Sequence, residues 1–92
     1  MPETSIIKQY IGLNGKTDVK ERATRLLNKI VKAIDKKIIT EKSKYFSKIK
    51  TIKKSLKSYI DGKTNKIEIY KAELNGLQGI ANSNASKKKS RN

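Results

Sequence analysis

Apolar residues recur along most of the chain at the three- and four-residue spacing that places side chains on one face of an α-helix. The clearest stripe lies in residues 18–39 and consists of Val19, Ala23, Leu26, Leu27, Ile30, Ile34 and Ile38. A second stripe lies in residues 41–60 and consists of Tyr45, Ile49, Ile52, Leu56 and Tyr59. We therefore predict two long amphipathic helices. Because the connection near Thr40 is short, we expect them to form an antiparallel hairpin that buries both stripes together.

A shorter helix is expected before the hairpin, over residues 4–11, where Ile6, Ile7, Tyr10 and Ile11 share one face. Glycines at positions 12 and 15 end this pattern. Asp18, followed three residues later by Glu21, resembles a capping box at the start of the next helix.

The segment after the hairpin is compatible with two structures. The favoured one is a helix from about residue 65 to residue 75, ended by Asn75 and Gly76, with a final turn that packs Leu77 and Ile80. In this helix Tyr70 shares the apolar stripe. The alternative is a short strand at residues 66–70, where apolar and polar side chains alternate, although such a strand has no obvious partner.

Residues 82–92 contain no large apolar side chain, so we expect them to form a disordered basic tail. The sequence thus predicts an all-α protein: one small helical bundle over residues 1–81, with a central antiparallel hairpin and short flanking helices, followed by this tail.

Composition excludes several kinds of chemistry. The 92 residues include no Cys, His or Trp, which removes disulfides, Cys/His zinc sites and Ser-His or Cys-His nucleophile pairs. The acidic residues are scattered, and Gly15-Lys16-Thr17 lacks the first glycine of a phosphate-binding loop. We expect no enzyme activity, no metal, no cofactor and no small-molecule substrate.

The net charge is +15, from 23 Lys and Arg against 8 Asp and Glu, and it is unevenly distributed. Residues 40–60 carry +6 and residues 87–92 carry +4. In the second long helix, Lys50, Lys54 and Lys57 follow i, i+4, i+7 spacing on the side away from the apolar stripe. Such a lysine face is often plain solvated surface, but segregation at this net charge favours binding of a polyanion.

The sequence therefore predicts a nucleic-acid-binding protein that contacts the phosphates of DNA or RNA, with low sequence specificity because Lys is a point charge. The candidate contacts are Lys50, Lys54 and Lys57, assisted by Lys44, Lys48 and Lys53, with Lys87, Lys88, Lys89 and Arg91 as a tether. Arg22 and Arg25 are the candidates for a specific contact, and a surface pair between Arg25 and Glu21 is the alternative.

Three other functions are compatible with this charge pattern. One differs from nucleic-acid binding mainly in stoichiometry, and the other two fit the sequence less well. The main alternative is a structural subunit of a virion interior or a ribonucleoprotein particle that binds an acidic partner, and exposed stripes also permit a homodimer. A helix-turn-helix is disfavoured by its long turn, and a membrane-surface helix by competition with burial in the bundle. We expect a cytoplasmic or particle-associated protein, neither secreted nor membrane-spanning.

Deletion of residues 82–92 tests the predicted tether. We expect weaker binding to nucleic acid and a smaller dependence of the binding constant on salt, because each lost phosphate contact lowers the log–log slope by about 0.9. Binding measured by fluorescence anisotropy at several salt concentrations checks this. The melting temperature should stay the same, and a large fall would show that the segment is part of the folded core.

Overall fold

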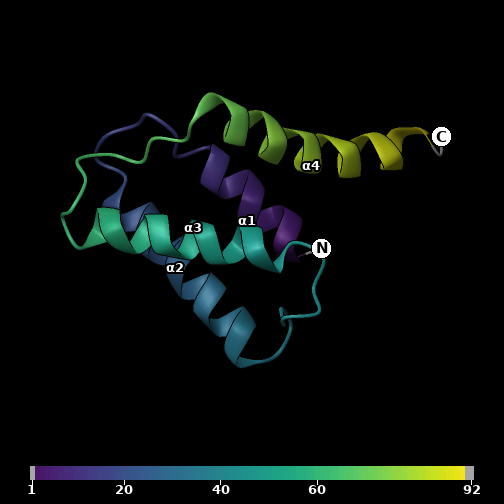
Figure 1. The fold of residues 1–92 in the computed structure, drawn as a ribbon, viewed down its shortest axis with the longest axis horizontal. Helices are drawn as coiled ribbons and strands as arrows, with labels where there is room; N and C mark the ends of the chain where they lie inside the picture. Colours follow the sequence, from purple (N-terminus) through teal and green to yellow (C-terminus); the bar gives the residue numbers. More distant parts are fainter. Residues whose placement is uncertain (1, 91–92) are drawn as a thin grey trace.

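The chain forms four helices in a computed structural model, which describes the backbone of residues 2–90 and the side chains of residues 3–82. They are α1 (Pro2–Ile11), α2 (Lys20–Asp35), α3 (Phe46–Ile60) and α4 (Lys71–Ser90). No strand occurs within residues 2–90, so the all-α class is confirmed (Figure 1).

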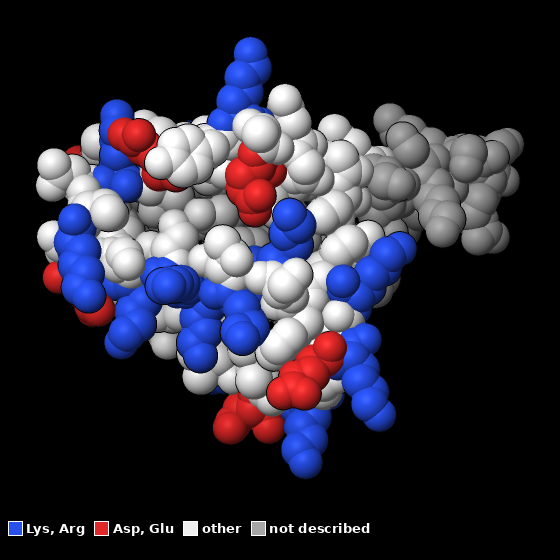
Figure 2. All heavy atoms as spheres, in the orientation of Figure 1, with Lys and Arg blue, Asp and Glu red and all other residues white. Residues whose placement is uncertain are grey.

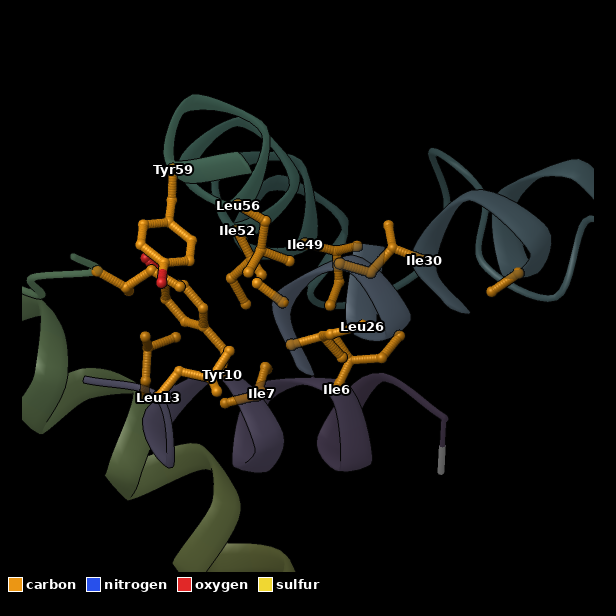
Figure 3. Packing of buried hydrophobic residues seen from close by; sticks show 14 of the residues in the cluster. Ile6, Ile7, Tyr10, Leu13, Leu26, Ile30, Ile49, Ile52, Leu56 and Tyr59 are labelled. Atoms are coloured by element: carbon orange, nitrogen blue, oxygen red, sulfur yellow. The ribbon is translucent and has the colours of Figure 1, made fainter. Parts of the chain in front are cut away.

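Helix α1 is the centre of the bundle, since it packs against each of the other three helices. Its residues Ile6, Ile7 and Tyr10 are buried and point toward the inner faces of α2 and α3 (Figure 3). A 10-residue helix is too short to be stable alone, so tertiary packing holds it. The sequence predicts α1 as a flanking helix, whereas it contributes Ile6, Ile7 and Tyr10 to the core and packs against all three other helices.

Helices α2 and α3 pack against one another, but they cross obliquely rather than lying along each other (Figure 1). The antiparallel hairpin is therefore not confirmed. Residues 36–45 connect the two helices, a longer connection than the sequence indicated. The buried residues of α3 are the expected ones: Ile49, Ile52, Leu56 and Tyr59.

The starts of α2 and α3 are held by side chains from other helices. The buried Glu3 carboxylate of α1 accepts a hydrogen bond from the backbone N–H of Tyr45, the residue before α3, at 2.9 Å. The Tyr59 hydroxyl of α3 accepts one from the N–H of Val19, before α2, at 3.3 Å. The predicted cap by Asp18 is wrong, because this residue is left-handed (φ 54°) and α2 has no side-chain cap.

Helix α2 ends at Asp35, four residues earlier than predicted, and its end changes which isoleucine is buried. Lys37 adopts a left-handed conformation (φ 61°), and the N–H of Ile38 donates to the carbonyl of Ala33 at 2.8 Å. This pattern is a Schellman motif, which turns the chain away from the helix axis. Ile38 is consequently 56% exposed, against expectation, and Ile39 is fully buried instead.

Residues 67–70 are neither helix nor strand, so the predicted start of a helix near residue 65 is wrong. This segment is hydrogen-bonded to the turn after α1: the N–H of Gly15 donates to the carbonyl of Ile67, and the N–H of Ile69 donates to Asn14 Oδ1, both at 2.7 Å. Ile67 is buried by this pairing. Tyr70 is 88% exposed and does not join an apolar stripe as predicted.

Helix α4 continues through Gly76 and Gly79 to Ser90, so the predicted break at Asn75-Gly76 is wrong. Leu77 is buried and Ile80 packs at the edge of the core, where α4 lies against α1. The helix passes the boundary expected at residue 81. The side chains of the expected tail, including Lys87, Lys88, Lys89 and Arg91, lie outside the described residues.

Adjacent isoleucines provide a matched test of this fold. Replacing Ile39 by Ala should lower the free energy of unfolding by about 2–5 kcal/mol, because it leaves a cavity in the core. Replacing Ile38 by Ala should change it by less than about 0.5 kcal/mol, because this side chain is largely exposed. Urea unfolding followed by circular dichroism measures both. The reverse order would show that α2 continues to residue 39 as the periodicity suggested.

Candidate nucleic-acid interface

The orientation of α3 decides where its lysines lie. Its apolar side chains face the core, and Lys50, Lys54 and Lys57 are exposed outside this apolar stripe. Figure 2 shows lysine side chains next to one another over the middle of α3, with the acidic side chains of this face outside that row.

These lysines border a groove of about 380 Å³ between α3 and the second half of α2. Its floor is apolar and consists of Ile34 from α2 and Phe46 from the first turn of α3. Its rim is formed by Lys50, Lys53, Lys54 and Lys57. We refer to these six residues as the lysine groove. The structure thus brings together the three main candidates and one of the three assisting ones.

Most of the rim carries no neutralising charge. Within residues 3–82, Lys50, Lys53 and Lys54 have no carboxylate within ion-pair distance. Lys57 Nζ lies 3.9 Å from Asp61 Oδ2, but both groups are exposed, and such pairs contribute little. The Lys50 ammonium lies 5.7 Å from the centre of the Phe46 ring, a cation–π contact that leaves its charge uncompensated.

The other two assisting lysines lie elsewhere. Lys48 Nζ is 3.6 Å from Glu73 Oε2 of α4, so this lysine bridges two helices instead of joining the groove. Lys44 precedes α3, and its ammonium lies 5.5 Å from the centre of the Tyr45 ring. Neither residue lines the lysine groove.

Arg22 and Arg25 line a separate hollow of about 390 Å³ between the end of α1 and the first half of α2. Gln9 and Lys16 also line it. The Arg25 guanidinium donates to Glu21 Oε1 at 2.6 Å, which is the surface pair weighed as the alternative. The two arginines therefore do not form one surface with the lysine groove.

Buried tyrosines contribute to the core rather than to a binding surface. The Tyr10 hydroxyl donates to Ser55 Oγ at 2.8 Å. Burial raises the pKa of the Tyr10 phenol, the nearby Glu73 charge adds to this, and the Ser55 hydrogen bond opposes it. Because the rings of Tyr10 and Tyr59 are buried, they are not accessible as platforms for nucleic-acid bases.

Sequence reasoning missed the groove floor. Ile34 belongs to the stripe predicted in residues 18–39, and Phe46 widens the stripe in residues 41–60, yet both are only partly buried. The two side chains come from different helices, Ile34 from α2 and Phe46 from α3, and they meet at one groove. The only sequence signal is the position of Phe46 at the edge of its stripe.

Within the described part of the chain, no three acidic side chains come close enough to hold a metal ion. None of the helices described there has the length and apolar character needed to cross a bilayer.

Comparisons with protein-family models, with curated proteins and with solved structures found no match for this chain. A functional assignment therefore has to come from the chemistry of its surface.

Proposed function

We propose that this protein is a small, non-catalytic nucleic-acid-binding protein that contacts the phosphate backbone through the lysine groove, with low sequence specificity. The supporting observation is that Lys50, Lys53 and Lys54 lie next to each other on one groove and have no acidic partner in the described residues. We place the protein in the cytoplasm or in a nucleic-acid-containing particle as part of this proposal.

The physical case starts from electrostatics. At a net charge of +15 the protein attracts polyanions, and the rim lysines without an acidic partner are available to them at close range. Each phosphate that a lysine neutralises releases condensed counterions, which supplies free energy that depends on salt but not on base sequence. Engagement of about five phosphates, by the groove and neighbouring cations, corresponds to a log–log salt slope of about −4 to −5.

Low sequence specificity follows from the residues at the groove. Lysine has no fixed geometry for base edges, whereas arginine and glutamine do. Arg22, Arg25 and Gln9 line the other hollow, and no Arg or Gln lines the lysine groove.

One observation favours the second candidate, a structural subunit of a virion interior or ribonucleoprotein particle. Val31 on α2 is 43% exposed and Ile38 is 56% exposed, so both side chains are available for an apolar contact with a neighbouring protein. Purification without nuclease separates the two. Co-purifying nucleic acid alone favours the first function, and a stoichiometric protein partner favours the second.

The triple variant Lys50→Glu, Lys54→Glu, Lys57→Glu tests the proposed surface. We expect retention on columns that carry immobilised DNA or RNA to be lost while the helical circular dichroism signal remains. Three exposed cations become anions, and the core does not change. Unchanged affinity would remove the lysine groove as the interface.

A control variant has the same change in net charge. Lys20→Glu, Lys29→Glu, Lys32→Glu alters three exposed lysines of α2 that do not line the lysine groove. Both variants lower the net charge from +15 to +9. We expect the control to retain most of its affinity. An equal loss of affinity in the two variants would show that binding depends on the net charge of the protein and not on a defined site.

A further inference from the structure

The lysine groove combines charge with an apolar floor, and a purely ionic interface has no use for that floor. Phe46 and Ile34 are only partly buried, and they line the groove together with the lysines of the rim. Leaving such side chains in water costs free energy, so the natural occupant has an apolar part as well as negative charge.

Duplex nucleic acid is a poor match for this floor. A double helix carries its phosphates outside and its bases stacked inside, so it can contact the lysines but leaves Phe46 and Ile34 uncovered. A single strand presents both parts, since its unpaired bases have exposed flat faces that stack on aromatic rings while its phosphates follow a cationic groove.

Two other occupants fit less well. A second copy of the chain would place four lysines against four lysines, and like charges in an interface oppose association. An acidic amphipathic helix needs apolar anchors over two turns or more, whereas this floor offers two apolar side chains at one place. A volume of about 380 Å³ is instead at the lower end of pockets that accept one small organic group, such as a nucleobase.

We propose that the lysine groove binds single-stranded nucleic acid in preference to duplex, with a base against Phe46 and Ile34 and the flanking phosphates on the four rim lysines. The inference rests on the proposed function and adds the strand state of the ligand.

The dimensions of α3 agree with this arrangement. From Lys50 to Lys57 the helix rises about 10 Å, which is enough for two or three nucleotides of a strand lying along it. The Lys50 ammonium lies over the Phe46 ring, 5.7 Å from its centre. When a base packs on the ring, this ammonium can move to the phosphate next to that base.

Binding of labelled oligonucleotides to the full chain tests the proposal. A 12-nucleotide oligothymidylate and a 12-base-pair duplex are compared by fluorescence anisotropy at one salt concentration. We expect the single strand to bind about tenfold more tightly, because the stacking of bases on an aromatic side chain is available to it alone.

Substitution of Phe46 identifies the floor as the source of the preference. Phe46→Leu keeps an apolar side chain but removes the ring, and should weaken single-strand binding about fivefold while leaving duplex binding unchanged. Phe46→Tyr should retain the preference. Tyr70→Leu is the matched control, because Tyr70 is an exposed aromatic residue outside the groove, and it should change neither affinity.

The outcomes separate this inference from the function on which it rests. Equal affinity of the normal chain for both ligands would overturn the single-strand preference and leave backbone binding intact, whatever the folding of the Phe46 variants. Binding of neither ligand would overturn both. Displacement of the strand by an acidic helical peptide, with the same dependence on Phe46, would assign the groove to a protein partner instead.

Discussion

Burial of the apolar face of α1 is the interaction on which the other features of this molecule depend. Ile6, Ile7 and Tyr10 fill the space between α2 and α3, and α4 packs on the same short helix. A chain with a net charge of +15 repels itself when compact, so its stability has to come from apolar burial. Glu3, from this helix, also holds the start of α3 through the N–H of Tyr45.

The lysine groove lies beside this core. Helix α1 packs against both α2 and α3, which cross obliquely (Figure 1), and Ile34 of α2 and Phe46 of α3 line the groove together with the lysines of α3. The rim ammonium groups repel one another at short range. Under the proposed function, a polyanion bound at the groove would relieve this repulsion.

The all-α class and most of the buried positions could be predicted from the sequence, because the period of burial along one helix depends only on the geometry of that helix. The buried set of α3 and the burial of Leu26 and Ile30 agree with the predicted stripes. The predictions were wrong at the ends of helices, where the helical periodicity stops. After the left-handed Lys37 the burial pattern shifts by one residue, and before Lys71 an extended segment pairs with the turn after α1. Both depend on contacts between distant residues.

The lysine groove, too, was predictable from the sequence only in part. The sequence by itself determined that Lys50, Lys54 and Lys57 point away from the core, since the stripe of α3 fixes which side faces solvent. Only the tertiary structure decided that Lys53 joins them and that Lys48 is paired with Glu73 of α4. The tertiary structure also decided the apolar floor of the groove, because Ile34 comes from α2 and Phe46 from α3. The spacing of residues within one helix carries no information about which residues of another helix will lie next to it.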